Sequence, residues 1–369
     1  MNANKVIVIF SGYNDRAVIS FIRTLEKKKI RYAVIARDNS DLIFKTKYKD
    51  NVLITRSSPS LEINFVEDAL NFVKKKFNAN EVLIAPSTEA LIRFFLKYQA
   101  ELNKINAIMP VVSQSLYELI SNKKSFSDLC LQYDINVPKE FADYNSTIPP
   151  FVAKPKEYES NGNKIYNPVL IFNKKQKDDF AKCHDITAFY YQEYIEGKSK
   201  YLLYYFDQNG IAYKFSQENI MQQGEGKSML AAKTSDYHLN EISVKFEHLF
   251  KSENFFGLVM VELKIYDNKD YMIEANPRFW GPSQLFVDAN ANFFEALLYD
   301  YGFIYSRPSF KKTKDTSYFW FGGFYKSITN GQASTICTYE DFLKLDKWIT
   351  NDVYKREDTI DVFLEELTK

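Results

Sequence analysis

The sequence predicts an α/β and α+β protein, in which a doubly wound α/β domain precedes a larger part built from antiparallel strands and helices. Three observations support this prediction. Apolar strand-like segments alternate with amphipathic helical segments over residues 5–110, as in parallel sheets covered by helices. Residues 199–265 contain strand-forming segments around one helical segment, 239–252. The chain has 369 residues, more than the roughly 250–300 that a single core accommodates.

The N-terminal strands and helices follow one another in a regular order. We expect strands at 6–10, 32–36, 52–55, 82–85 and 107–109, and helices at 17–25, 65–77 and 88–98. Ligands of such sheets bind at the carboxyl ends of the strands, so the loops Ser11-Gly12-Tyr13 and Ser87-Thr88-Glu89 are candidates for a substrate-binding rim. Ordinary helix capping explains the second loop equally well.

Composition and charge exclude several classes of protein. The net charge of +1 argues against bulk attraction to nucleic acid or to a membrane surface. The sequence has no run of about 18 apolar residues that could span a bilayer, and it enters an apolar strand directly, so we expect no signal peptide and a cytoplasmic location. Three separated cysteines favour a reducing compartment, and three histidines lack zinc-ligand spacing. These residues are Cys130, Cys183, Cys337, His184, His238 and His248.

Two lysines mark the middle of the chain. Lys123 lies at the start of a predicted helix, and the adjacent Lys124 leaves it open which of the two has a functional position. Lys154 follows the apolar strand 151–153. A lysine there must either extend to solvent or meet an anion.

An acidic hairpin is the most informative pattern. If its turn centres on Asn268, Glu262 and Glu274 lie opposite each other on one face. The two carboxylates would repel unless a cation or a proton lies between them. Asn276 adds a neutral oxygen on the same face, and this donor set suits a hard ion such as Mg²⁺. Arg278 would supply a planar positive group for a charged oxygen beside the ion. The alternative is a solvated hairpin whose charges share one face.

The hairpin carries a resemblance to a known family. Glu-x-Asn-Pro-Arg at 274–278, followed by Phe-Trp-Gly and preceded by Glu262, resembles the metal-binding signature of the ATP-grasp superfamily. The form is similar to that of the carboxylate–amine ligase and carbamoyl-phosphate-synthase-like branch. Lys123 and Lys154 match the two phosphate-binding lysines of the superfamily, in the same order. The loop after Lys154 has a single glycine, Gly162, where members often have a glycine-rich flap.

The sequence Tyr-Tyr-Gln-Glu-Tyr-Ile-Glu-Gly resembles the hinge that passes the adenine base in this superfamily. The resemblance implies that the side chain of Gln192 accepts a hydrogen bond from the adenine amino group. It also implies that the hinge backbone, from Glu193 through Tyr194 to Ile195, pairs with the adenine edge. Many relatives hold the ribose with an acidic residue at the position of Ser199, so a weaker ribose contact is expected there.

The resemblance also implies a domain organisation. We expect an N-terminal α/β domain over 1–112, the first part of the ATP-grasp fold over 113–192 with a mobile lid subdomain at about 140–190, a nucleotide and metal subdomain over 193–301, and a C-terminal extension over 302–369.

The loop 222–228, with Gly226 and Ser228, lies where related ligases place a substrate-facing segment, although a mobile surface loop is nearly as good an interpretation. The aromatic run 318–324 predicts packing first, and a homodimer or acceptor surface second.

The activity implied is that of an ADP-forming carboxylate–amine ligase. A small-molecule carboxylate would become an acyl phosphate at the expense of ATP, and an amine would then displace phosphate. The resemblance implies Mg²⁺, or Mn²⁺ in its place, held by Glu262, Glu274 and Asn276, with Arg278 and Lys154 as catalytic residues. Bicarbonate activation, as in biotin carboxylases, and a non-catalytic ATP-binding protein are the alternatives. The sequence does not identify the carboxylate or the amine.

Overall fold

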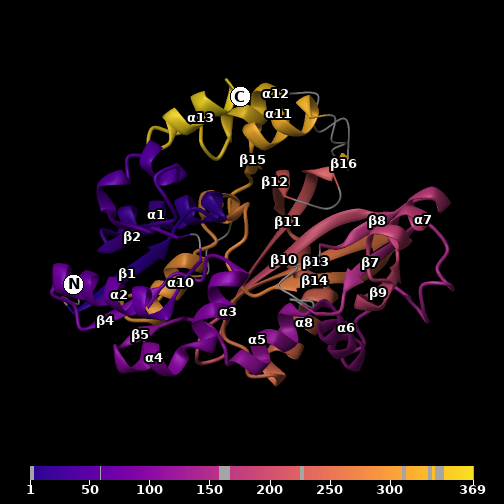
Figure 1. Cartoon of the computed structure of the whole chain (residues 1–369), viewed down its shortest axis with the longest axis horizontal. Helices are drawn as coiled ribbons and strands as arrows, with labels where there is room; N and C mark the ends of the chain where they lie inside the picture. Colours follow the sequence, from indigo (N-terminus) through magenta and orange to yellow (C-terminus); the bar gives the residue numbers. More distant parts are fainter. Residues whose placement is uncertain are drawn as a thin grey trace.

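Three β-sheets organise the described part of the chain. The computed structural model describes residues 4–58, 60–157, 167–224, 228–309, 313–330, 335–336 and 345–368. Figure 1 shows the N-terminal sheet on the left, the large sheet in the centre, the small sheet on the right and the C-terminal helices along the top. The mixed α/β class predicted from the sequence is confirmed.

The N-terminal sheet is parallel, with strand order β3-β2-β1-β4-β5. Its strands are β1 (Lys5–Phe10), β2 (Tyr32–Ala36), β3 (Val52–Thr55), β4 (Glu81–Ile84) and β5 (Ala107–Ile108), and its helices are α1 (Asp15–Lys28), α2 (Ile63–Phe77), α3 (Glu89–Lys97) and α4 (Gln99–Lys104). Side chains on one face of β1 pack in the same core as α1, and those on the other face pack with α2 and α3. The strand order reverses between β1 and β4, so a crevice is expected where the loops after these two strands separate.

The large sheet is antiparallel, with strand order β14-β13-β10-β11-β12-β15, and β16 pairs with β11. Its strands are β10 (Lys198–Phe206), β11 (Ala212–Gln222), β12 (Met229–Ser235), β13 (Gly257–Tyr266), β14 (Lys269–Asn276), β15 (Ser317–Phe319) and β16 (Thr335–Ile336). One face packs on α5 (Gln114–Ser121), α6 (Lys123–Gln132) and α8 (Glu241–Ser252). The other face shares its core with α1, α9 (Ser283–Asp288) and α10 (Phe293–Asp300). The large sheet is therefore joined to the N-terminal domain by a common core.

The small sheet has the order β6-β9-β7-β8 and a core of its own. It consists of β6 (Glu140–Phe141), β7 (Phe151–Pro155), β8 (Val169–Ile171) and β9 (Phe189–Glu193), with α7 (Lys174–Cys183) against it. Its core side chains, such as Phe151 and Tyr191, point towards α7. The alternate side chains therefore point the opposite way, because neighbouring residues of a strand face opposite sides. This unit spans the residues for which the sequence predicts a lid.

The C-terminal residues bridge the N-terminal domain and the large sheet. They form β15 and the helices α11 (Phe321–Thr329), α12 (Leu345–Thr350) and α13 (Ile360–Glu366), which lie across the top of Figure 1. Asp358 lies 2.7 Å from Nε of Arg23 on α1 and accepts a hydrogen bond from the Tyr48 hydroxyl. β15 pairs with β12. In the described residues, no helix is long and apolar enough to cross a membrane.

Candidate functional site

The acidic hairpin has the pairing expected from the sequence, but a bulge produces it. β13 and β14 are joined by a two-residue turn at 267–268, in which both residues have a left-handed backbone, as in the tight turns of hairpins. Counting from this turn alone would place Ile273 opposite Glu262. The register shifts by one residue next to Glu262, so that Glu274 becomes its partner. Because a shift of one residue moves a side chain to the other face, the bulge brings the two carboxylates together.

The two carboxylates have different charges in the free protein. Burial, together with the charge of Glu274, raises the pKa of Glu262 to about 7. Burial acts in the same direction on Glu274, but the ammonium of Lys123, with Nζ 2.9 Å from Oε2, outweighs it and lowers the pKa of Glu274 to about 2. At neutral pH Glu274 is ionised and Glu262 is only partly so. A cation between them would favour the ionised form of both.

Asn276 and Arg278 extend the polar face of the hairpin. The amide nitrogen of Asn276 donates to Oε1 of Glu274 at 2.7 Å, and its Oδ1 accepts from Nη2 of Arg278 at 2.9 Å. In the described residues, no group of three Asp, Glu, His or Cys side chains could hold a metal. The hairpin instead offers two carboxylates and an amide oxygen. This set suits Mg²⁺, which usually takes few protein ligands and keeps water or phosphate oxygens in its shell.

The structure distinguishes Lys123 from its neighbour. Asn122 caps α6 by accepting from the amides of Lys124 and Ser125, which orients the first residue of the helix towards the hairpin. Lys123 pairs with Glu274, whereas Lys124 pairs with Asp128 and Glu140, both more exposed. Lys123 is therefore the lysine that belongs to the hairpin site.

Lys154 reaches the same site from the small sheet. Its Nζ donates to the carbonyl of Ile273, the bulged residue, at 3.0 Å. Burial and the nearby charge of Lys123 lower the pKa of Lys154 to about 8. A buried ammonium held by one carbonyl gains strongly from a nearby anion, because the anion compensates for lost hydration.

Two other polar groups lie on the same face of the small sheet as Lys154. Tyr190 is the register partner of Lys154, and Gln192 is two residues further along β9. Both are buried, and within the described residues neither the Tyr190 hydroxyl nor Oε1 of Gln192 has a hydrogen-bond partner. Buried polar atoms are rarely left without partners. This face is therefore suited to a polar ligand that supplies them.

The hinge residues continue from this face into β10. The amide of Glu193 donates to the carbonyl of Lys139, and the amide of Tyr194 donates to that of Pro150; Ile195 is buried. Gly197 has no room for a side chain, because a Cβ there would lie 2.2 Å from the carbonyl oxygen of Ile265. The chain therefore passes close against β13 where it leaves the hinge.

Ser199 has a different environment from the one expected of a ribose contact. It is buried, its hydroxyl donates to Glu262 at 3.3 Å and accepts from Nδ2 of Asn219 at 2.8 Å. Asn219 in turn accepts from Gln217 at 2.7 Å. Ser199 thus donates a hydrogen bond to the Glu262 carboxylate, and its hydroxyl already has two hydrogen-bond partners.

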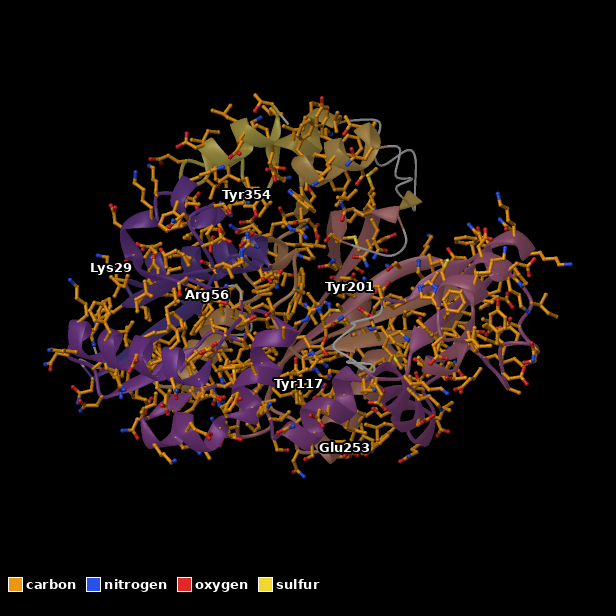
Figure 2. The ribbon with its side chains drawn as sticks, viewed as in Figure 1. Lys29, Arg56, Tyr117, Tyr201, Glu253 and Tyr354 are labelled. Carbon is orange, nitrogen blue, oxygen red and sulfur yellow. The ribbon has the colours of Figure 1, made fainter. Side chains whose placement is uncertain are left out.

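An open pocket of about 610 Å³ extends from the hairpin to the N-terminal domain. Its lining comes from the hairpin and the turn after it, from the loops that follow β1 and β4, and from the ends of β11 and β12. The residues are Asn14, Arg16, Ser87, Thr88, Glu89, Ala90, Tyr201, Gln222, Ser228, Met229, Met260, Glu262, Glu274, Asn276, Arg278, Trp280, Gly281 and Pro282. Tyr201, labelled near the centre of Figure 2, belongs to the floor formed by β10. The pocket thus occupies the crevice expected between β1 and β4.

Only part of the predicted rim lines this pocket. Ser87, Thr88, Glu89 and Ser228 do so, and Gly226 lies outside the described residues. The loop Ser11-Gly12-Tyr13 does not line it. The reason is that these residues face the end of β2: the hydroxyl of Ser11 donates to Asp41, and the guanidinium of Arg37 bonds the Gly12 carbonyl and lies over the Tyr13 ring.

Asn14 and Arg16 are among the pocket residues that the sequence analysis did not propose. Asn14 has a left-handed backbone and donates to the carbonyls of Ser87 and Phe279, which joins both rim loops to the turn after the hairpin. Arg16 lies in the first turn of α1, where a positive charge is unfavourable because of the helix dipole. That departure from the usual preference is the one sign of function in the sequence at this position.

Comparisons with known proteins agree with the fold. No protein-family model matches the sequence, and no curated protein matches it significantly. Among solved structures, the biotin carboxylase of Campylobacter jejuni is 14% identical, with a TM-score of 0.61, over 84% of this chain and 73% of that one. The N5-carboxyaminoimidazole synthetase of Staphylococcus aureus is 17% identical, with a TM-score of 0.60, over 85% and 81%. The L-amino acid ligase of Bacillus licheniformis is 15% identical, with a TM-score of 0.55, over 80% and 73%.

These proteins differ in name but share one architecture. Their identities to this chain are too low to transfer an activity, whereas their coverage shows the same arrangement of elements over most of its length. The motifs that suggested the family occur in this arrangement at one site, from Lys123 to Arg278. The chain has the fold of the ATP-grasp ligases.

Proposed function

We propose that the protein is an ATP-dependent, ADP-forming ligase that activates a carboxylate as an acyl phosphate and joins it to an amine. The observation that carries this proposal is the meeting of two lysines from separate elements with the acidic hairpin at one end of the pocket. Lys123 pairs with Glu274, and Lys154 contacts the bulge beside it. Such a site combines positive charge for phosphates with oxygen ligands for a hard cation.

The residues present fit a nucleotide and Mg²⁺. The unpartnered Oε1 of Gln192 would accept a hydrogen bond from the adenine amino group, and Lys123 and Lys154 would hold the phosphates. Glu262, Glu274 and Asn276 would hold the metal, which neutralises phosphate charge when bound. The Campylobacter jejuni biotin carboxylase was solved with β-γ-ATP, and the biotin carboxylase domain of the Hydrogenobacter thermophilus 2-oxoglutarate carboxylase with MgADP and bicarbonate. Those ligands support the same class of ligand here.

The reaction follows from the charges in the pocket. A carboxylate oxygen attacks the γ-phosphorus of ATP, the bond to the bridging oxygen breaks, and ADP leaves. The amine nitrogen then attacks the acyl carbon, loses a proton, and inorganic phosphate departs. Arg278 lies beside Asn276 and would stabilise negative charge on the transferring group. The small sheet, β6 to β9, would act as a lid that excludes water, because an acyl phosphate hydrolyses.

Activation of bicarbonate is the second candidate. The chain is similar in structure to the Campylobacter jejuni biotin carboxylase, with a TM-score of 0.61, as it is to the Staphylococcus aureus synthetase, with a TM-score of 0.60. The first half of the chemistry is the same, because bicarbonate also attacks the γ-phosphorus through an anionic oxygen. The two candidates differ in the acceptor.

Product analysis separates the candidates. ADP release is measured with Mg²⁺, ATP and a panel of amino acids, dipeptides and sugar acids, with hydroxylamine present to trap an acyl phosphate as a hydroxamate. We expect a hydroxamate with one class of acid, and only when ATP and Mg²⁺ are present. Biotin-dependent ADP release from bicarbonate without any hydroxamate would favour the carboxylase. Nucleotide binding without turnover under any condition would indicate a non-catalytic protein.

Nucleotide binding is tested separately by calorimetry with a non-hydrolysable ATP analogue and Mg²⁺. We expect Lys154→Ala to weaken binding by about tenfold or more, the effect of losing one charge-assisted hydrogen bond. Lys156→Ala is the matched control, because Lys156 lies two residues further along and its side chain is exposed. Equal affinities for both variants would remove Lys154 from the proposed site.

A further inference from the structure

The pocket contains a second guanidinium besides that of Arg278. Arg16 is the second residue of α1 and lines the pocket. Its Nη1 donates to the carbonyl of Met229 at 2.9 Å and to the Tyr318 hydroxyl at 3.0 Å. Its Cζ lies 3.8 Å from the ring centre of Trp320. Three contacts from β12, β15 and the residue after it therefore fix the position of this group.

All three contacts are with neutral groups. In the described part of the chain, Arg16 forms no ion pair with a carboxylate within 4.0 Å, unlike Arg23 on the same helix, which pairs with Asp358. Two carboxyls lie at longer range. Burial raises the pKa of Asp15 to about 6 and that of Glu366 to about 7, so at neutral pH Asp15 is mostly ionised and Glu366 only partly so, but neither forms an ion pair with Arg16. Arg16 is thus held in position by neutral groups and has no direct ion pair in the described residues.

The guanidinium also lies close to Gly281. A Cβ built on Gly281 would lie 3.1 Å from Nη2, 3.3 Å from Cζ and 3.5 Å from Nη1 of Arg16, so a larger residue would press on the guanidinium. In the described residues, Nη2 and Nε form no hydrogen bond that competes with a ligand. Arg16 and Gly281 both line the pocket.

Two of the other charged residues that line the pocket form ion pairs. Glu89 accepts from Nε of Arg93 at 2.9 Å, and Glu274 pairs with Lys123. Arg278 is bonded to Asn276 and lies at the hairpin, where the phosphates would bind. With the hairpin occupied as in the proposed function, Arg16 is left as a cation without a direct ion pair at the N-terminal side of the pocket.

We propose that Arg16 binds a non-reacting carboxylate of the acid or the amine substrate. A guanidinium edge with two donors matches a carboxylate in geometry, and its single charge matches a monoanion. One of the substrates is then an amino acid used through its amine, or an acid that bears a second carboxylate. Tyr318 and Trp320, from the C-terminal residues, would then position the guanidinium that binds the substrate carboxylate. This inference rests on the proposed function and identifies the class of its substrate.

The test compares acids with their amides. Substrates that release ADP in the panel are assayed next to analogues in which one carboxylate is a carboxamide, first on the amine substrate and then on the acid, so that the two sources are distinguished. We expect one amide to raise KM at least tenfold, since an unmatched polar group in a built site is strongly disfavoured. Arg16→Met should raise KM for the carboxylate about 10- to 100-fold, leave KM for ATP within about twofold, and remove the preference over the amide.

Arg23→Lys is the control variant, because Arg23 holds the same C-terminal segment from the same helix but does not line the pocket. Its KM values should equal those of the wild type. Arg16→Lys, which keeps the charge and loses the fork, should fall between wild type and Arg16→Met. If Arg16→Met affected the acid and the amide equally, Arg16 would have a structural role only and the inference would be overturned.

Direct binding decides the inference even if no ligase activity is found. The same compounds are titrated by calorimetry into wild-type protein and Arg16→Met, with Mg²⁺ and a non-hydrolysable ATP analogue present. A carboxylate that binds only the wild type would support the site although the proposed function had failed. Equal binding to both proteins, or no binding by any carboxylate in the panel, would overturn it.

Discussion

The two walls of the pocket are built in different ways. The hairpin wall comes from one short stretch of sequence. Its polar groups contact one another or a nearby lysine: Glu274 pairs with Lys123, and Arg278 donates a hydrogen bond to Asn276. The N-terminal wall is assembled from loop ends far apart in sequence. It is held by hydrogen bonds to backbone carbonyls, such as those that Asn14 donates to Ser87 and Phe279.

This difference suggests a division of labour. Charged and polar groups that are held in fixed positions before a reaction stabilise the charge that develops in its transition state. Polar side chains on a wall of loops are better placed to contact the variable parts of a substrate. We therefore expect substitutions in the hairpin to change turnover and nucleotide binding, and those in the N-terminal wall to change KM for the acid or the amine.

The largest effect is expected at Glu274. Glu274→Gln removes one of the two charges proposed to hold the metal, so kcat for ADP release should fall about 100- to 1000-fold, or roughly 3–4 kcal/mol. Circular dichroism should show an intact fold. Glu62→Gln, on an exposed residue before α2, is the control. Near wild-type turnover in Glu274→Gln would contradict the proposed metal site and the catalytic role of the hairpin.

The adjacent lysines of α6 sharpen the definition of the hairpin wall. Lys123→Ala removes the partner of Glu274 and a proposed phosphate ligand, so the Kd for the ATP analogue should rise about 10- to 100-fold. Lys124→Ala should leave it unchanged, because Lys124 pairs with Asp128 and Glu140 instead. Calorimetry measures both. The reverse order of effects would contradict the register seen in the structure.

The pH dependence of nucleotide binding tests Lys154. Its pKa in the free protein is about 8, below the ordinary 10.5, so the ammonium is charged below pH 8 and loses its proton above it. If only the charged form binds phosphate, the Kd for the ATP analogue should rise by up to about tenfold per pH unit above 8. Between about pH 8 and 10.5 the unfolded chain binds the additional proton, so the free energy of unfolding from this group should rise with pH.

Lys154→Arg provides the matched control, because a guanidinium stays charged throughout this range. Binding by this variant should be flat between pH 7.5 and about pH 9.5. A wild-type profile that is equally flat would show that Lys154 does not contact the nucleotide.

The smallest effect is expected in the N-terminal wall. Glu89→Ala should raise KM for the acid or the amine by several-fold, on the order of one lost hydrogen bond, and leave KM for ATP unchanged. Tyr13→Ala is the comparison, because Tyr13 belongs to the predicted rim but does not line the pocket. If Glu89→Ala changed only the melting temperature, Glu89 would be a first-turn charge of α3 paired with Arg93 and nothing more.

The sequence alone determined those features that depend on neighbouring residues. The order of strands and helices over 5–110 follows from the alternation of apolar and amphipathic segments. The prediction paired Glu262 with Glu274 by centring the turn on Asn268. The turn lies at 267–268, and the pairing is present because of the bulge at Ile273, which the prediction did not include. The prediction of a metal and phosphate site depends mainly on Glu274, Asn276 and Arg278, which lie within five residues of one another.

The tertiary structure decided which separate segments meet. Ser11, Gly12 and Tyr13 point to the end of β2, and Asn14 and Arg16 point to the pocket, because the backbone turns at Asn14 into a left-handed conformation. Ser199 is covered by Asn219 and Glu262, which come from other strands. Tyr318 and Trp320 reach Arg16 only because β15 pairs with β12. Side-chain directions in loops depend on such long-range contacts, and periodicity along the chain contains no information about them.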